Sequence, residues 1–554
     1  MLRVTIMTTH SVPRLPLRFV RRAVGLALSG LTVLAVPASA QGDFVGLSSL
    51  RSTLFIERTQ EGFFPSSGDL FGFAFVAADF SGDGVDELVT GIPTDNCSAA
   101  VLDCGAVFLS WGNPGLGLID QGGFLWAGAP GSPATAGEGD KYGRALAAGD
   151  FNHDGLADLV IGAPGGNLFA VSGNAQIHYG LPGAIQVVPE HILQPGIAGV
   201  PDDGMDDQNR NARFGAAFAV GDFNGDGHDD LATGSPDWTF EGDPLVFDTG
   251  AVVVAHGHLG GLVPFEGFLV TQDESGIPDD AENFDRFGSA LAAGDFNGDA
   301  FDDLVIGVPR EDGVGAILVL FGSPDSLLFA NHYWLGEVDL GSTGASGDRF
   351  GETLATGDFD GDGFDDLAIG VPGQDDGDGD FDIGMVGVLY GAAGSPLGGG
   401  GGFNWAATQW WWEGLIGEVS DGHDLFGMSL AAADFNGDGF DDLAIGAPGE
   451  LIFAVQHGEV LVLPGGAGRL SASAAPFSAG RRGLAAPEIS QTNYGFGEAL
   501  VAGDFDGNGF ADLVVGMPKM DLPGAKEAGG ELVLYGSLFS DGFESGDRSA
   551  WSTP

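Results

Sequence analysis

A cassette of fixed internal spacing recurs seven times along the 554-residue chain, and it constrains the fold more than any other feature. In every copy an aromatic residue is followed by glycine, an aspartate comes eight residues after the aromatic residue, and Gly-x-Pro starts twenty residues after it. Consecutive aspartates lie 63 to 76 residues apart, so the cassette is constant and the connecting segments absorb the differences in length. The aromatic residues are Phe71, Tyr142, Phe214, Phe287, Phe350, Phe426 and Phe496.

Each repeat contains about four candidate β-strands. In the second repeat, a run of small apolar residues at 145–151 leads into an acidic segment, and a second apolar run follows at 159–162. Radial repetition of four-stranded units is typical of β-propellers, so we expect an all-β fold with seven four-stranded blades. Third-strand candidates lie at 106–111, 251–255, 316–321, 459–463 and 531–535, and less regular fourth candidates lie at 267–272 and 409–413.

The two ends of the repeat region complement each other. The last repeat stops at its third candidate strand, 531–535, while a lone candidate strand, 52–57, precedes the first cassette. We expect the two to pair, so that the N-terminal strand completes the last blade and closes the ring without an open edge. An open solenoid with frayed ends is the alternative.

The amino-acid composition limits the kinds of partner that the protein can bind and the kinds of fold that it can adopt. The chain has 78 acidic residues against 20 Lys and Arg, a net charge of −58, and such a surface repels nucleic acid and anionic lipid while it attracts cations. An apolar content of 44% is enough for a large core, and two cysteines exclude a disulfide-built scaffold. The 98 glycines follow no collagen period and indicate many tight turns.

The first 40 residues have the features of a secretory signal peptide. Five arginines and no acid precede an uncharged stretch at 23–36, and Ala38-Ser39-Ala40 supplies a cleavage pattern. We therefore divide the chain into a signal peptide (1–40), a propeller (41–536) and a short acidic tail (537–554); an uncleaved membrane anchor is the alternative reading of the leader. In an oxidising compartment Cys97 and Cys104 are expected to form a local disulfide.

The aspartate of each cassette opens a nine-residue acidic loop. Oxygen-bearing side chains occupy loop positions 1, 3, 5 and 9, and position 6 is glycine in six copies, which allows a sharp turn. Hard cations take six to eight oxygens from carboxylates, amides and backbone carbonyls, and position 7 would offer its carbonyl. Histidine and cysteine do not recur at these positions, which disfavours zinc and copper. We expect up to seven structural Ca²⁺ ions.

The candidate ligands are the residues at positions 1, 3, 5, 7 and 9 of each loop. The first three loops offer Asp79, Ser81, Asp83, Val85 and Glu87; Asp150, Asn152, Asp154, Leu156 and Asp158; and Asp222, Asn224, Asp226, His228 and Asp230. The fourth and fifth offer Asp295, Asn297, Asp299, Phe301 and Asp303; and Asp358, Asp360, Asp362, Phe364 and Asp366. The sixth and seventh offer Asp434, Asn436, Asp438, Phe440 and Asp442; and Asp504, Asp506, Asn508, Phe510 and Asp512.

The aromatic-Gly pair, the aspartate loop and Gly-Ala-Pro, as at 162–164 and 446–448, resemble the FG-GAP repeat of integrin α-subunit propellers and of secreted bacterial proteins. The resemblance covers about 52–536. It implies that each loop joins the first and second strands of a blade and binds calcium on one face, while partners are recognised mainly on the opposite face. Ala300 at position 6, Asn508, Ser81 and Glu87 depart from the pattern, and we expect the fifth loop, with four carboxylates, to bind most tightly.

Two classes of function stay open. The first is a secreted or cell-surface recognition and adhesion module, a non-catalytic monomer that binds an extracellular protein or glycan; the second is an extracellular propeller enzyme acting on polysaccharide. No Ser-, zinc- or nucleotide-type catalytic motif occurs in the sequence. The run 410–412 of three tryptophans is expected to pack between blades or to form a binding platform, with the middle ring facing away from its neighbours.

Overall fold

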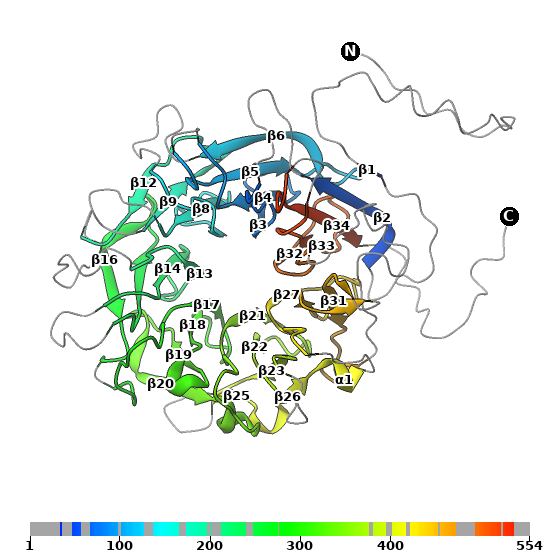
Figure 1. The fold of residues 1–554 in the computed structure, drawn as a ribbon. Helices are drawn as coiled ribbons and strands as arrows, with labels where there is room; N and C mark the ends of the chain where they lie inside the picture. The colour runs from blue at the N-terminus through cyan, green and yellow to red at the C-terminus, as the bar shows by residue number, and fades with distance from the viewer. Residues whose placement is uncertain are drawn as a thin grey trace, which may run out of the picture.

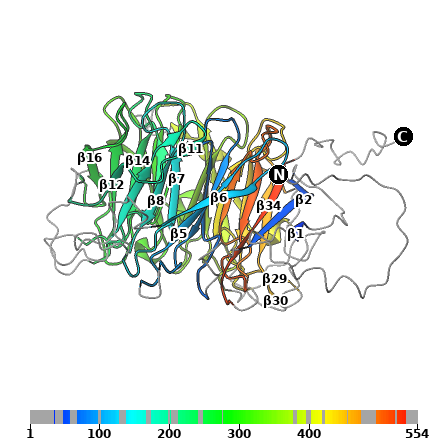
Figure 2. The ribbon, with the colours of Figure 1, turned by 90° about the horizontal axis from the view of Figure 1, so that it is seen from above.

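Seven small antiparallel sheets stand in a ring around a central axis, and each sheet is one blade (Figure 1). Figure 2 shows the ring edge-on as a disc, with the strands running through its thickness. The predicted seven-bladed β-propeller is confirmed. The computed structural model describes residues 34–35, 47–56, 67–97, 101–126, 137–165, 173–196, 200, 212–239, 247–274, 276–375, 381–394, 401–416, 422–452, 455–472, 494–521 and 525–536.

The strands of each blade are given from the centre of the ring outward. The first three blades are β3 (Ala74–Ala78), β4 (Glu87–Ile92), β5 (Ala106–Trp111) and β6 (Ile119–Trp126); β7 (Ala145–Gly149), β8 (Asp158–Ala163), β9 (Asn174–His178) and β12 (His191–Leu193); and β13 (Ala217–Gly221), β14 (Asp230–Ser235), β15 (Ala251–His256) and β16 (Val263–Val270). The fourth and fifth are β17 (Ala290–Gly294), β18 (Asp303–Val308), β19 (Ala316–Phe321) and β20 (Leu328–Gly336); and β21 (Thr353–Gly357), β22 (Asp366–Val371), β23 (Met385–Leu389) and β26 (Gln409–Trp411). The sixth has β27 (Ser429–Ala433), β28 (Asp442–Ala447) and β31 (Glu459–Leu463), and the seventh has β32 (Leu500–Gly503), β33 (Asp512–Gly516), β34 (Gly530–Gly536) and β2 (Leu47–Ile56).

Small accessory elements decorate the loops. The two-stranded ladders are β10 (Gly180–Leu181) with β11 (Ala184–Ile185), β24 (Gly391–Ala392) with β25 (Gly402–Phe403), and β29 (Leu451–Ile452) with β30 (Val455–Gln456). The short helices are η4 (Glu311–Gly313), η5 (Glu337–Leu340), η7 (Trp405–Ala407) and α1 (Glu413–Ile416). The sixth blade differs from the four-stranded expectation in having three strands among the described residues, and residues 473–493, which follow it in sequence, lie outside them.

The N-terminal strand closes the ring, as predicted. β2 pairs antiparallel with β34, with Thr53 opposite Val533 and Ile56 opposite Gly530, and the two strands lie side by side in Figure 1. The strand begins at Leu47, earlier than the expected residue 52. β1 (Leu34–Ala35) pairs with the other edge of β2, so cleavage of a signal peptide after Ala40 would remove β1 and leave the closing strand. Apart from β1, the predicted signal peptide lies outside the described residues, as does the acidic tail.

Small side chains allow seven strands to converge at the centre. The innermost strands are rich in alanine and glycine, for example Ala-Leu-Ala-Ala-Gly in both β7 and β17, and neighbouring innermost strands contact each other around the whole ring, with β32 against β3 as the last contact. Bulky residues here would push the blades apart. The residue after each loop aspartate, such as Phe151 and Phe359, is instead fully buried between blades.

The two glycines of the repeat form the contact between one blade and the next. A Cβ atom on Gly162 would lie 2.2 Å from the carbonyl oxygen of Gly215, which belongs to the aromatic-Gly pair of the following blade. The same contact recurs at Gly446 with Gly497 and closes the ring at Gly516 with Gly72. The spacing of twenty residues thus places a glycine where each blade meets the backbone of its neighbour.

The three consecutive tryptophans serve mainly as packing residues. Trp410 lies in the core cluster between the fourth and fifth blades, where its indole N–H donates to the Leu340 carbonyl at 3.1 Å. Trp411 is 5% exposed and lies in the core between the fifth and sixth blades. The middle ring therefore faces away from Trp410, as strand alternation requires, and Trp412 is the most exposed of the three.

A buried glutamate at the junction of the seventh and first blades gives a pH prediction. Burial raises the pKa of Glu531 to about 8, and its Oε2 accepts a hydrogen bond from the Thr90 hydroxyl at 2.7 Å. Between about pH 4.5 and 8 the unfolded chain releases this proton while the folded chain keeps it, so the residue costs stability as the pH rises. We expect Glu531→Gln to raise the melting temperature more at pH 8.5 than at pH 5. An equal shift at both values would contradict this, and Glu190→Gln, at an exposed position, is the control.

Candidate functional site

The seven acidic loops lie on one face of the propeller. Each loop joins the first strand of its blade to the second, as in the segment between β21 and β22, and the seven innermost strands run in the same direction. The loops therefore gather at one end of the disc. All residues of all seven loops are described.

The carboxylate at loop position 1 holds the turn in shape. In the fifth loop, Asp358 Oδ1 accepts backbone N–H groups from Gly361 at 2.8 Å and Asp362 at 3.1 Å, and Oδ2 accepts that of Gly363 at 3.0 Å. The position-5 carboxylate of Asp362 accepts the Phe364 N–H at 3.2 Å. In every other loop, too, the position-1 carboxylate accepts the N–H groups of positions 5 and 6, and the position-5 side chain accepts that of position 7, which fixes the direction in which these side chains point.

The carboxylate at position 9 ties the loop to the blade. Asp366 is fully buried, and its two oxygens accept the N–H groups of Phe359 at 2.9 Å and of Gly391, after the third strand, at 2.7 Å. Burial first, and then the carboxylates of Asp360 and Asp358, raise the pKa of Asp366 to about 8. This position is structural as well as a candidate ligand, because it joins three segments of one blade.

Three of the seven loops bring three acidic groups together. In each of these loops, one oxygen from each of three carboxylates lies within 4.8 Å of the other two. In the first loop, which has serine at position 3, the third carboxylate is that of Glu87 at position 9, whose side chain is longer than that of aspartate. In the fifth and seventh loops, an aspartate at position 3 supplies one of the three carboxylates. The three sets are Asp79, Asp83 and Glu87; Asp358, Asp360 and Asp366; and Asp504, Asp506 and Asp512.

Three other loops have asparagine at position 3, with its amide turned toward position 9. Asn436 Nδ2 donates to both oxygens of Asp442 at 3.1 Å, and the third and fourth loops repeat the contact through Asn224 and Asn297. A cation at this place requires the amide oxygen, so the side-chain amide would have to turn over. In the second loop the buried Asn152 Oδ1 has no hydrogen-bond partner.

Unpaired oxygens fit a cation. Glu87 Oε1 and Asp360 Oδ1 are buried and have no hydrogen-bond partner in the first and fifth loops. A buried carboxylate oxygen without a donor is costly unless a cation or proton compensates it. The donor set is all oxygen, which suits a hard ion such as Ca²⁺.

The side chain at position 7, expected to matter only for its carbonyl, packs on the preceding loop. A Cβ atom on Gly298, position 4 of the fourth loop, would lie 2.1 Å from the Phe364 ring. Between the second and third loops, position 4 is His153 instead of glycine, and its ring centroid lies 5.4 Å from that of His228 at position 7. The contact continues around the ring to Gly507, which faces Val85.

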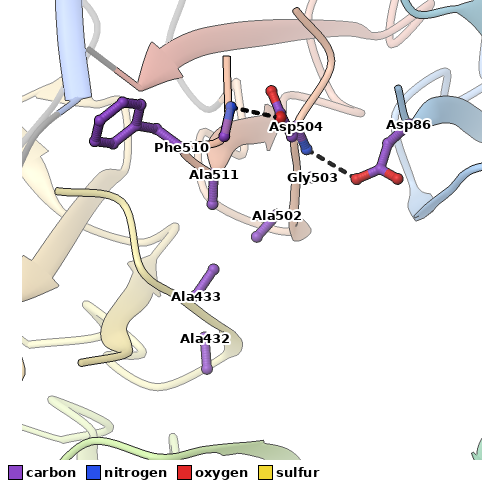
Figure 3. Close-up of a pocket in the computed structure, with 9 residues that line it drawn as sticks. Asp86, Ala432, Ala433, Ala502, Gly503, Asp504, Phe510 and Ala511 are labelled. Carbon is purple, nitrogen blue, oxygen red and sulfur yellow. Dashed lines mark hydrogen bonds between the residues drawn. The ribbon is translucent and has the colours of Figure 1, made fainter. Parts of the chain in front are cut away.

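The aspartates at position 8 form a second set of contacts between loops, which the sequence reasoning missed. Asp86 Oδ2 accepts the N–H of Asp504 at 2.8 Å, across the junction of the seventh and first blades (Figure 3). Four further bonds of 2.7–3.0 Å link position 8 of one loop to position 1 of the preceding one. Position 8 is alanine in the second and seventh loops; Ala511 and Asp86 line a hollow of about 340 Å³. The signal available in the sequence was the recurring Asp-Asp pair at positions 8 and 9. The other position-8 acceptors of this kind are Asp229, Asp302, Asp365 and Asp441.

The predicted departure at position 6 of the fourth loop has a visible backbone cost. Ala300 has a φ of 69°, in the left-handed region where a Cβ atom is unfavourable. We expect Ala300→Gly to stabilise the protein by about 1 kcal/mol, measured by chemical unfolding. Gly363→Ala in the fifth loop is the reverse control, because its φ is 88° and an added Cβ would meet no atom within 4 Å. A destabilised Ala300→Gly protein would contradict the argument.

The two cysteines lie far from the loops, between the second and third strands of the first blade. Their sulfur atoms are bonded, with Cα atoms of Cys97 and Cys104 5.9 Å apart. The bridge closes a short turn on the face opposite the acidic loops.

The comparisons with known proteins agree with this geometry. The FG-GAP repeat model matches six segments, at residues 142–178, 214–254, 287–320, 350–389, 426–469 and 496–529, which are the second to seventh cassettes. Integrin alpha-PS2 of Drosophila melanogaster is 32% identical over 290 residues, covering 50% of this chain and 18% of that protein. Integrin alpha-5 of Xenopus laevis is 31% identical over 239 residues, covering 42% and 20%.

An enzyme is also among the relatives. Phosphatidylinositol-glycan-specific phospholipase D of Bos taurus is 32% identical over 185 residues, covering 32% of this chain and 19% of that protein. The chain thus spans about a fifth of the length of these relatives. Among solved structures, a rhamnogalacturonan lyase aligns with 91% of this chain and 74% of its own at 13% identity, with a TM-score of 0.37.

Six matched repeats, a seventh of the same structure in the first blade, and the integrin α relatives lead to one classification. The chain is an FG-GAP repeat protein whose β-propeller resembles that of the integrin α subunits.

Proposed function

We propose that this propeller is a calcium-loaded, extracellular recognition module without catalytic activity. The observation that carries the calcium part is the fifth loop, where three carboxylate oxygens lie within 4.8 Å of one another. Asp360 Oδ1 is buried without a hydrogen-bond partner, while Oδ2 of the same side chain lies 3.6 Å from Arg469 Nε. Calcium suits a site built wholly by protein oxygens better than magnesium, which keeps several of its waters.

The role of calcium in this proposal is structural. The loops that would bind it are the same loops that contact each other through positions 4, 7 and 8. A bound ion compensates the repulsion between the carboxylates of one loop and so holds the position-1 amide and the position-7 side chain where the neighbouring blade meets them.

The proposed recognition surface is the face opposite the acidic loops. Loops between the second and third strands, and between one blade and the next, form this face. Among the described residues, the three phenylalanines that are more than a third exposed all lie in these loops: Phe247, Phe284 and Phe381. Phe247 and Phe284 are adjacent, since the Phe284 N–H donates to the Phe247 carbonyl at 2.9 Å. Exposed apolar groups of this kind favour a protein or glycan partner.

The enzyme alternative has less support. The same face contains acids with raised pKa values, but Glu413 is 1% exposed and Asp424 is fully buried. A polysaccharide could not reach groups at that depth. The phospholipase D relatives match the propeller over a fifth of their length, which transfers no catalytic residue to this chain.

Export is proposed from the leader, which has the features of a signal peptide, and from the bonded cysteines, which suit an oxidising compartment. In the described ranges, no helix combines the length and apolar character needed to span a bilayer.

A binding screen tests the proposal. Purified protein would be applied to glycan arrays and to panels of extracellular proteins, with calcium and with EGTA. For any ligand found, Phe247→Ser with Phe284→Ser should weaken binding at least tenfold, while Leu116→Ser with Leu259→Ser, exposed on the calcium-loop side, should not. Equal loss in both variants, or turnover of a polysaccharide by the wild type, would refute the assignment.

A further inference from the structure

A second group of acids lies on the face opposite the loops, at the junction of the fifth and sixth blades. Glu413 follows β26, Asp424 comes two residues before Phe426, and Glu450 follows the end of β28. One carboxylate oxygen of each lies within 4.8 Å of the others. Their side chains are 1%, 0% and 6% exposed, so water does not solvate the charges.

Glu413 provides the observation that points to a ligand. Both of its oxygens are buried and no donor group satisfies either of them; the side chain within hydrogen-bonding reach is the Asp424 carboxyl, another acid. Burial first, and then the charges of Asp424 and Glu450, raise the pKa of this carboxyl well above its ordinary value, and the fully buried Glu459 acts in the same direction. The charged groups with the largest effect on Glu413 are therefore acids, and a positive charge would compensate them.

The neighbouring junctions supply an internal comparison. The three acids occupy defined positions of the repeat. One follows the fourth strand, one lies two residues before the aromatic-Gly pair, and one lies four residues after the first glycine of Gly-x-Pro. In each of the two preceding junctions, these positions hold two acids and one glutamine. These sets are Gln272, Asp285 and Glu311, and then Glu337, Asp348 and Gln374.

In each of those junctions, a neutral group donates to one glutamate oxygen, while Glu337 Oε2 has no hydrogen-bond partner. Gln272 Nε2 donates to Glu311 Oε2 at 2.7 Å, and the Ser342 hydroxyl donates to Glu337. The junction at Glu413 has a third acid where each of the others has an amide. An acid cannot donate as an amide does unless it is protonated, so the third carboxylate needs a cation in place of the donor.

We propose that Glu413, Asp424 and Glu450 form a buried divalent-cation site of the calcium class, separate from the seven loops. Carboxylate-only ligands select a hard ion. The ion would join the end of the fifth blade to two loops of the sixth, on the face opposite the acidic loops. The inference does not depend on the recognition role proposed above.

The test counts ions. Wild type and Glu413→Gln would be saturated with Ca²⁺, freed of loose metal, and the bound calcium measured by mass spectrometry of the metal. We expect Glu413→Gln to lose one ion per chain. Glu450→Gln, which gives this junction the acid and amide arrangement of the preceding one, should do the same and serves as the second variant. Glu337→Gln in that preceding junction is the matched control and should lose none.

A spectroscopic measurement locates the loss. Tb³⁺ replaces Ca²⁺ at such sites, and excitation of Trp411 and Trp412, beside Glu413 in sequence, should sensitise its emission. We expect Glu413→Gln to remove most of the tryptophan-sensitised signal, while Asp366→Asn in the fifth loop lowers the ion count and leaves that signal. An unchanged ion count in both folded glutamine variants would overturn the proposal and leave a cluster of shared protons.

Discussion

Excess EGTA is expected to lower the melting temperature of the purified protein by roughly 10 °C. If only the first, fifth and seventh loops are occupied, at an ion concentration one hundred times the Kd, each contributes about 2.7 kcal/mol and the three together about 8 kcal/mol. The reason is local: the carboxylates of Asp358, Asp360 and Asp366 converge within 4.8 Å, and without an ion their repulsion acts where one blade meets the next. Differential scanning calorimetry with and without calcium measures the shift.

Loop variants show whether the shift comes from these sites. Asp360→Asn gives the fifth loop the sequence of the sixth, and we expect it to reduce the calcium-dependent shift in melting temperature by about a third. Asp280→Asn changes an exposed acid outside the loops and should leave the shift unchanged. The same melting temperature in EGTA and in calcium would contradict the structural role proposed for the ion. Full reversal by Mg²⁺ alone would contradict the choice of calcium.

The repeat made most of the fold predictable. The offsets of eight and twenty residues are set by one strand, one loop and a second strand, all within a single blade, so they can be recognised in the amino-acid sequence. Closure was also predictable, because an unpaired third strand at one end and a lone strand at the other leave few alternatives. Fourth strands were harder: the candidate 267–272 is shifted from the observed β16, and 409–413 is cut short where α1 begins at Glu413.

Contacts between one repeat and the next could not be predicted from the sequence. Asp365 and Asp295 are 70 residues apart, and their hydrogen bond depends on how neighbouring blades are rotated about the axis. Local spacing does not encode that rotation. The packing of the position-7 side chains was not predicted for the same reason. Nor was the acidic cluster of Glu413, Asp424 and Glu450, because each of these sets joins segments that come together only in the folded ring. The candidate calcium ligands of each site lie within one loop, which is why their positions could be proposed from sequence.

The part of the FG-GAP propeller that should be most sensitive to change is the closing strand. β2 supplies the outer edge of the last blade, and its pairing with β34 closes a loop of roughly 470 residues, at an entropic cost on the order of 5 kcal/mol. The ladder offsets that cost in the intact chain. Without β2, the edge of β34 would be exposed to other chains.

Deletion of residues 47–56 is therefore expected to lower the melting temperature by more than 10 °C and to produce dimers or aggregates in size-exclusion chromatography. Thr53→Pro with Phe55→Pro should act in the same direction, because proline removes ladder donors. Deletion of 537–554, which leaves every described strand in place, is the control. A synthetic peptide of residues 47–56 added to the deletion variant should pair with β34 and restore a monomer, as a strand added to an open sheet edge does. A deletion variant that stays monomeric and melts like the wild type would mean that the innermost strands, which already meet at β3 and β32, hold the ring without the closing strand.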